Sequence, residues 1–367
     1  MSNSELKREE EQSFLNEDHE QPIPPKEVVA YNELRSCADL FRMYKNGKLE
    51  IQPDFQREVV WKQDERSRFI DSLVKQLPIP SMCFSLDSST QTWKVIDGLQ
   101  RMSSIITFLG DAAWKITNLD DIHPLLKNKT NIELKNGSED QKRLYSSVED
   151  MSIPITVIRC DYNEKSHMRY LYMIFNRLNS GGVRLNNQEI RNCIYSGNFN
   201  NMLKEFDKTN DDWRVVKKRI WGSMSRFRSV EVLLRALAFS KDLEIYNGNL
   251  AGYLNDYMDG ASKYDFHKIE YVVRALSFMS MSARKVLNNM TPGKKSVTFM
   301  EGLLVGLLDN YERFERLDTA HLDNLIIKKS KEYPALPSFI NVQRYAVSNE
   351  NIVKTRLKEA KVLFSNT

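Results

Sequence analysis

The stretch "TWKVIDGLQRMSSIITFLG" (residues 92–110) changes its pattern of apolar residues in the middle. Before Gly98, apolar and polar residues mix as they do in a strand, and after it the apolar residues follow helical spacing. The sequence therefore predicts a strand that runs into a helix, which begins near residue 101 and ends at Gly110.

Four polar or flexible residues, Asp97, Gly98, Gln100 and Arg101, occupy this junction. A helix that opens at a glycine presents free backbone N–H groups and a positive dipole end, which suit a phosphate. Arg101 can bind a phosphate oxygen, and Asp97 can hold Mg²⁺, a water or a ribose hydroxyl. Gln100 can orient a water or bond a base edge. The alternative is a plain capped helix in which Asp97 pairs with Arg101.

A second candidate junction is "FNRLNSGGVRLNNQEIR" (175–191), where two predicted helices meet at a glycine pair. Asn186 and Glu189 have the spacing of a capping box. A glycine turn beside arginines suits an anion, and the alternative is a helical hairpin with a solvated polar face. Candidate ligand-binding residues here are Arg177, Asn179, Gly181, Gly182, Glu189 and Arg191.

A third element, "PDFQREVVW" (53–61), is predicted to be extended. Its alternation places Arg57 on the same side as Phe55, and Asp54 on the other side. An arginine on an apolar face either extends to solvent or is held by an acid.

Composition places few limits on function. The chain has 367 residues, 41% of them apolar and 28% charged, and a net charge of +4. These values fit a soluble globular protein, and the charge is too small to indicate nucleic-acid binding by itself. Four well-separated cysteines predict neither disulfides nor a zinc site. No signal-peptide core or membrane span occurs, so we expect a cytoplasmic protein without a membrane partner.

The order of apolar patterns predicts three regions. Residues 1–26 are polar and acidic and are expected to form a mobile tail, while 27–197 mix strands and helices and 198–367 are helical throughout. Within the mixed region, "SMCFSLD" is predicted to be a half-buried strand and the polar stretch 127–143 a surface excursion.

The most basic stretch is "WRVVKKRIWGSMSRFR" (213–228), in which aromatic residues separate the cations. Such a patch can neutralise phosphates and stack bases, and the alternative is a solvated helix face beside core aromatics. The candidate nucleic-acid contacts are Lys217, Lys218, Arg219, Arg226 and Arg228.

Together these elements resemble the N-terminal domain of GmrSD-type, modification-dependent (type IV) restriction enzymes over roughly residues 30–240. The resemblance rests on "IQPDFQREVVW", Pro78-Ile79-Pro80, the box Asp97-Gly98-Leu99-Gln100-Arg101, "FNRLNSGGVRLNNQEIR" and "RFRSVEVLLRALAF". It implies an α+β fold, with a ParB/sulfiredoxin-like N-terminal domain followed by an all-α domain.

The resemblance also implies a nucleoside triphosphate with Mg²⁺ as cofactor and hydrolysis coupled to sensing modified or phage DNA. Asp97, Gln100 and Arg101 would be catalytic, with Asp97 as the metal ligand. Arg57, Gly98 and the second-junction residues would bind the nucleotide. The family box reads Asp-Gly-Gln-Gln-Arg, so Leu99 departs from it: hydrolysis is weakened if that position contacts the nucleotide, and unaffected if it faces the core.

Many relatives carry a C-terminal HNH nuclease domain, and no His-rich pattern of that kind follows residue 240. The resemblance thus implies a nucleotide-binding module whose cutting activity is supplied by a separate nuclease subunit or is absent. A non-hydrolysing nucleotide- or DNA-binding module is one alternative. A direct ParB-like nuclease using Asp54, Asp97 and Glu189 is another, and homo-oligomerisation is left open.

Overall fold

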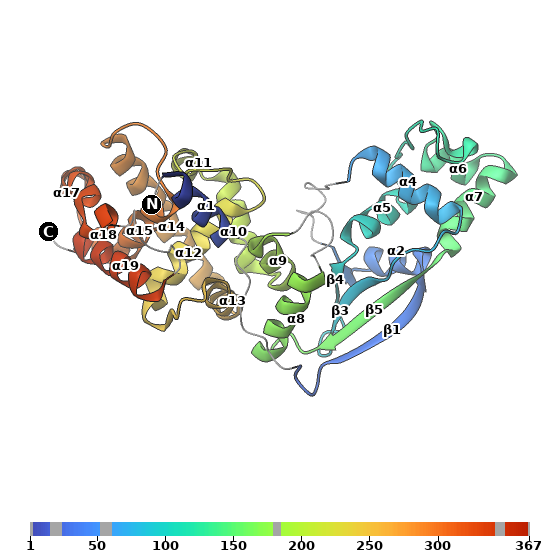
Figure 1. Cartoon of the computed structure of the whole chain (residues 1–367), viewed down its shortest axis with the longest axis horizontal. Helices are drawn as coiled ribbons and strands as arrows, with labels where there is room; N and C mark the ends of the chain where they lie inside the picture. The colour runs from blue at the N-terminus through green and yellow to red at the C-terminus, as the bar shows by residue number, and fades with distance from the viewer. Residues whose placement is uncertain (1–2, 15–23, 52–60, 179–184, 342–348, 366–367) are drawn as a thin grey trace. The chain divides into compact units, whose positions relative to one another are not determined.

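The computed structural model describes residues 3–14, 24–51, 61–178, 185–341 and 349–365. Its contacts divide the chain into two compact units (Figure 1). The sheet unit is Pro22–Arg184, and the helical unit joins Met1–Gln21 to Leu185–Thr367. The division therefore falls between residues 184 and 185, earlier than the predicted boundary at 197, and the first residues group with the last ones.

The sheet unit contains one five-stranded mixed sheet in the order β1-β5-β3-β4-β2. Its strands are β1 (Val29–Ser36), β2 (Leu49–Glu50), β3 (Met82–Asp87), β4 (Trp93–Asp97) and β5 (Ser152–Cys160). β1 and β5 are antiparallel, as are β3 and β4, whereas β3–β5 and β2–β4 are parallel. The α+β fold class is thereby confirmed.

β3 differs from its prediction, because all six of its residues are buried. It lies between β5 and β4, which pair with its two edges, and the burial of every residue means that other parts of the chain also cover both of its faces. Alternation of polar and apolar residues is typical of a strand with one face exposed to solvent. Here Ser85 and Asp87 are buried and satisfied, Ser85 by the Tyr162 hydroxyl and Asp87 by the adjoining turn.

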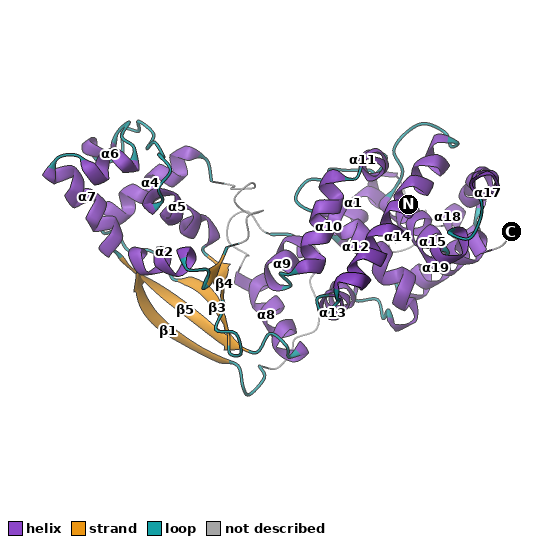
Figure 2. Ribbon diagram, turned by 180° about the vertical axis from the view of Figure 1, so that it is seen from behind, coloured by secondary structure: helices purple, strands orange, loops and turns teal. Residues whose placement is uncertain are grey.

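Helices cover one face of the sheet, with α2, α4 and α5 grouped beside it in Figure 2. The helices of this unit are α2 (Cys37–Lys45), α4 (Gln63–Val74), α5 (Leu99–Leu109), η1 (Pro124–Leu126), α6 (Asn131–Asn136), α7 (Glu139–Asp150) and α8 (Lys165–Leu178). Between these helices and the strands lies a core in which Phe84, Ile105 and Val157 are fully buried. This core fixes the start of α5 against the end of β4.

The polar stretch 127–143 forms more structure than predicted. Two capping boxes, Thr130 with Glu133 and Ser138 with Gln141, start α6 and α7. Leu134 on α6 is fully buried in the core. The sequence pattern missed these helices because they are short and bury few apolar residues each, so helical periodicity is weak there.

The helical unit contains no strand within its described residues. Its helices are α1 (Asn3–Ser13), α9 (Asn187–Ile194), α10 (Asn198–Thr209), α11 (Asp211–Lys218), α12 (Arg228–Asp242), η2 (Leu243–Ile245), α13 (Leu250–Ala261), α14 (Phe266–Asn288), α15 (Val297–Asp309), α16 (Tyr311–Phe314), α17 (Thr319–Glu332), η3 (Tyr333–Ala335), α18 (Pro337–Asn341) and α19 (Glu350–Ser365). α15 is buried along almost its whole length and packs against α12, α14 and α19. It is therefore the central helix of this unit.

Residues 3–14 correct the predicted mobile tail. They form α1, whose Glu10 side chain accepts hydrogen bonds from the backbone and hydroxyl of Thr298 at 2.9 and 2.8 Å. Phe14 is 2% exposed and lies beneath the guanidinium groups of Arg228 and Arg235. The polar composition suggested disorder, but α1 packs against partners more than 200 residues further along the chain, which composition does not reveal.

Candidate functional site

Gly98 joins β4 to α5 and adopts a backbone conformation that favours glycine. Its φ is +97°, and a Cβ atom placed on it would lie 2.5 Å from Cγ of Met82 on β3. Any other residue would meet both an unfavourable φ and this close neighbour. Glycine is therefore required for β4 to turn into α5 while it stays paired with β3.

The first turn of α5 has no side-chain cap. Gly98 is the N-cap residue and has no side chain to accept a hydrogen bond from the turn. The first backbone N–H groups of a helix have no partner within it, and the helix dipole places partial positive charge there. The start of α5 thus has the electrostatic character that binds anions in other proteins.

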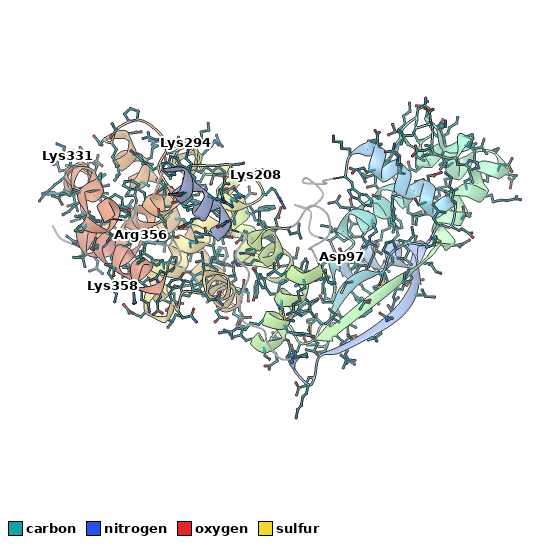
Figure 3. The ribbon with its side chains drawn as sticks, in the orientation of Figure 1. Asp97, Lys208, Lys294, Lys331, Arg356 and Lys358 are labelled. Atoms are coloured by element: carbon teal, nitrogen blue, oxygen red, sulfur yellow. The ribbon has the colours of Figure 1, made fainter. Side chains whose placement is uncertain are left out.

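Asp97 and Arg101 form an ion pair across this first turn (Asp97 is labelled in Figure 3). Arg101 Nη2 lies 2.8 Å from Asp97 Oδ2, and the Arg101 side chain is 14% exposed. Its guanidinium also donates to the backbone oxygens of Pro80 and Ser81. Burial lowers the pKa of Arg101 from its ordinary value, and the neighbouring carboxylate of Asp97 opposes that shift. The guanidinium is therefore held in place and charged at the helix start.

Gln100 and Leu99 lie in different environments, one polar and one apolar. The Gln100 side-chain oxygen lies 3.5 Å from the backbone nitrogen of Trp61, at the long limit of a hydrogen bond. Leu99 packs against the hydrophobic core of the sheet unit. Because the departure from the family box faces the core, Leu99 leaves the polar face of the junction intact.

Asp97 is the metal ligand that the sequence suggests. Its Oδ2 atom pairs with Arg101, while its side chain is 37% exposed. Among the described residues no group of three or more His, Cys, Asp or Glu side chains could hold a metal ion. Mg²⁺ often binds one or two carboxylates together with phosphate oxygens and waters, so a single carboxylate fits a nucleotide-borne Mg²⁺ and not a metal held by protein alone.

The structure describes only one of the remaining candidate residues of the sheet unit. Arg177 lies near the end of α8, which packs against β4. Arg57, Asp54, Asn179, Gly181 and Gly182 lie outside the described residues, so their predicted roles stay predictions.

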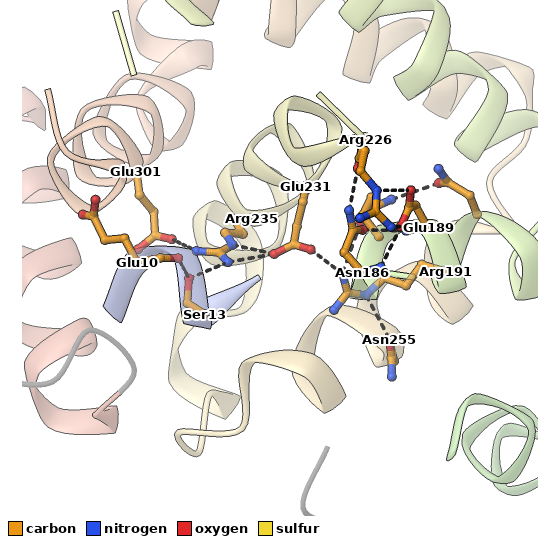
Figure 4. A network of polar contacts seen from close by, with 12 residues as sticks. Glu10, Ser13, Asn186, Glu189, Arg191, Arg226, Glu231, Arg235, Asn255 and Glu301 are labelled. Atoms are coloured by element: carbon orange, nitrogen blue, oxygen red, sulfur yellow. Dashed lines mark hydrogen bonds and ion pairs between the residues drawn. The ribbon is translucent and has the colours of Figure 1, made fainter. Parts of the chain in front are cut away.

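Glu189 and Arg191 lie in the helical unit, in a buried polar network drawn in Figure 4. Glu189 is 3% exposed and accepts two hydrogen bonds from the Arg226 guanidinium, at 2.9 and 2.6 Å. Its backbone and side chain also complete the predicted capping box with Asn186, which is confirmed. The Glu189 side chain thus caps the start of α9 and binds the Arg226 guanidinium.

Arg191 is 1% exposed and bonds Glu231 and Asn255, at 3.0 and 2.9 Å. Glu231 in turn receives Arg235 at 2.7 Å, which extends the network toward Glu301. Both side chains therefore stabilise the helical unit, and their nucleotide-binding role stays a prediction. The motifs 175–191 and 226–239 meet here, a pairing that local patterns do not reveal.

The predicted nucleic-acid contacts are mostly committed to neighbours. Lys217 pairs with Asp207 at 3.0 Å, and Arg219 donates to the backbone oxygen of Gly293 at 2.9 Å. Arg226 binds Glu189, and Arg228 covers the Phe14 ring. Of the five candidates Lys218 is the exposed one. Four of these five side chains therefore make contacts within the protein and do not form a continuous cationic surface. DNA contact by this stretch stays a prediction.

Two further properties bear on the class of protein. All four cysteines are buried free thiols. Within the described residues, none of the helices is apolar over a long enough run to cross a bilayer.

The site thus belongs to a mixed α+β domain. It lies where strand β4 ends and helix α5 begins, and the first turn of α5 has the electrostatic character that suits an anion. Residues 37–196 match the family model described as the GmrSD restriction endonuclease, N-terminal domain. This part of the chain therefore belongs to the GmrSD N-terminal domain family, which relates the protein to restriction systems. The match runs from α2 through α9, so the family domain includes one helix of the helical unit. Searches of curated proteins and of solved structures found no match.

Proposed function

We propose that the junction of residues 97–101 binds the phosphates of a nucleoside triphosphate with Mg²⁺ and that its hydrolysis serves a DNA-directed restriction system. The observation that carries this proposal is the uncapped start of α5 at Gly98, flanked by Asp97 and Arg101, within a GmrSD-family domain. Backbone N–H groups and a guanidinium are the groups that stabilise negative charge on transferring phosphates.

Each residue has a distinct part in this proposal. Gly98 admits the phosphate chain close to the backbone, and the N–H groups behind it donate to phosphate oxygens. Arg101, held by the Pro80 and Ser81 carbonyls, stabilises charge on the phosphate. Asp97 offers one carboxylate oxygen to Mg²⁺, which would neutralise phosphate charge when bound, and Gln100 orients a water.

The ion pair between Asp97 and Arg101 sets a condition for binding. An arriving phosphate competes with Asp97 for the guanidinium, and an arriving cation competes with Arg101 for the carboxylate. Nucleotide and Mg²⁺ together satisfy both partners, whereas either alone leaves one of them without its counter-charge. We therefore expect Mg²⁺ and nucleotide to bind cooperatively.

The test is phosphate release from ATP, GTP, CTP and UTP, with and without DNA containing modified bases. Asp97→Asn and Arg101→Ala should each abolish turnover. Arg68→Ala on α4, which removes a surface ion pair with Asp121, is the matched control and should retain turnover. Turnover that persists in both junction variants, with their circular dichroism unchanged, would contradict the proposal.

A second candidate is a module that binds the nucleotide without hydrolysing it. The pairing of Asp97 with Arg101 favours it, because the described junction holds no second carboxylate in ion-pair contact that could serve as a base. Calorimetric binding without phosphate release, under every DNA condition above, would select this candidate.

A further inference from the structure

A cavity of about 250 Å³ opens in the helical unit among α12, α13, α14 and α15, away from any residue discussed so far. Its floor is apolar, formed by Leu237, Val272 and Leu308. Pockets for drug-sized ligands occupy roughly 300–1,000 Å³, so this cavity suits a single ring system. Its walls and rim, in contrast, are aromatic and charged.

Three tyrosines, Tyr257, Tyr264 and Tyr271, form the walls. Phe199 meets the first two edge-on, at ring centroid distances of 6.2 and 5.6 Å, which fixes their planes. The Tyr271 hydroxyl donates to Glu312 at 2.9 Å. Burial and then this bond raise the pKa of Tyr271 to about 12, so the phenol keeps its proton at neutral pH. The walls are thus neutral, preorganised aromatic surfaces.

Two lysines lie at the rim beside these rings. Lys268 Nζ is 4.8 Å from the Tyr271 ring centroid, and Lys241 Nζ is 3.2 Å from the Tyr264 hydroxyl. Within the described chain both ammonium groups contact tyrosines, and neither forms an ion pair with a carboxylate. Both are therefore available for an anionic group on a ligand whose ring enters the cavity.

The cavity is also lined by the carboxylates Asp309 and Glu312. Asp309 pairs with Lys361 at 2.8 Å, which neutralises it. Glu312 uses Oε1 to accept from Tyr271, and its Oε2 atom has no partner among the described residues. Glu312 can therefore accept one more hydrogen bond from an N–H donor on the ligand.

We propose that this cavity binds a nucleotide through its base, with the ring against the tyrosines, the phosphate on Lys241 and Lys268, and an exocyclic amine donating to Glu312. Base stacking on aromatic rings and lysine contacts to phosphate are the general means of holding nucleotides, and a carboxylate accepts from base amines. The ligand class is an amine-bearing nucleotide, either free or within a single DNA strand. This site is independent of the junction at Asp97.

The experiment is calorimetry on the full chain without Mg²⁺, with AMP, CMP, UMP and inorganic phosphate as probes. Running it in both the wild type and Asp97→Asn separates this cavity from the junction. AMP and CMP should bind about tenfold more tightly than UMP, which lacks the amine, as one hydrogen bond to a charged group implies. Short oligo(dA) and oligo(dC) strands then distinguish a free nucleotide from a DNA strand as the source.

Lys268→Met should weaken AMP binding about tenfold, whereas Lys263→Met, whose ammonium faces Asp259 outside the cavity, should leave it unchanged. Glu312→Gln should remove the preference for AMP over UMP without affecting the fold, because Glu312 is exposed. Equal binding of UMP and AMP by the wild type, binding of phosphate alone with the same affinity, or an unaltered Lys268→Met variant would each overturn the proposal.

Discussion

At the scale of single residues, Gly98 sets the geometry on which the candidate site depends. Two independent constraints meet at its Cα atom, a positive φ and the side chain of Met82. Gly47 has a positive φ as well, but nothing lies within 4 Å of the position of its missing Cβ. A comparison of substitutions at the two glycines therefore distinguishes the free-energy cost of backbone strain from that of a steric clash.

We expect Gly98→Ala to destabilise the sheet unit by about 2–4 kcal/mol, strain and overpacking combined. Gly47→Ala, which meets strain alone, should cost about 1 kcal/mol. Urea unfolding monitored by circular dichroism measures both changes. Equal losses for the two variants would mean that Met82 yields and that the junction tolerates a side chain.

The capping box of Asn186 and Glu189 could be predicted because its partners are three residues apart. The bonds from Glu189 to Arg226 and from Arg191 to Glu231 join residues about forty positions apart, and no local pattern contains them. The same residues were expected to bind a ligand because polar residues near glycines suit both roles. The structure shows the structural role of these buried side chains, which depends on the whole fold.

At the scale of elements, the hairpin of β3 and β4 positions Asp97. Asp87 ends β3 and accepts hydrogen bonds from Ser89, Thr90 and the backbone of Tyr162. Burial by itself raises the pKa of Asp87, and these bonds together bring it below the ordinary 3.8. The ionised carboxylate thus holds the turn that returns the chain into β4.

A lowered pKa in the fold means that Asp87 contributes stability above about pH 4, and that this contribution is lost as the pH falls through the lowered pKa. We expect Asp87→Asn to cost about 1–3 kcal/mol at pH 7, because donors lose a charged acceptor. The difference from the wild type should shrink below pH 4, as followed by urea unfolding across pH. Asp120→Asn, at an exposed position, is the control. A difference that does not change with pH would contradict the role of the charge.

Elements with strong periodicity were predicted well, as α5 and α8 show. The helices α6 and α7 were missed, since their stability comes from caps and from a few contacts to the core. The full burial of β3 was missed for a related reason: it depends on its central place in the sheet and on what packs on both faces of the sheet. Sheet order is a property of long-range pairing, and alternation along one strand does not report it.

At the scale of the whole molecule, the helical unit is built from both ends of the chain. α1 supplies Glu10 to Thr298 and Phe14 to the arginines of α12. Ser13 also accepts a hydrogen bond from Arg235 at 3.1 Å, beside the pair of Arg235 and Glu231. Glu10, Ser13 and Phe14 are therefore buried parts of this unit.

We expect Phe14→Ala to lower the stability of the helical unit by about 3–5 kcal/mol, since a buried aromatic ring is lost. Scanning calorimetry should show a lower transition temperature for the helical unit and an unchanged one for the sheet unit. Phe266→Ala, which removes a ring that is 75% exposed, should change neither transition. A shift of both transitions in Phe14→Ala would show that the two units unfold as one.

The position of α1 has a consequence for the order of events on the ribosome. Its partners Arg235 and Thr298 are made more than two hundred residues after it, so a nascent chain carries an unattached amphipathic segment through most of its synthesis. The strand β1 likewise waits for β5, over a hundred residues later, before it has a neighbour. β1 therefore gains its neighbour before half of these 367 residues are made, whereas α1 has its full set of contacts only once Thr298 has been added.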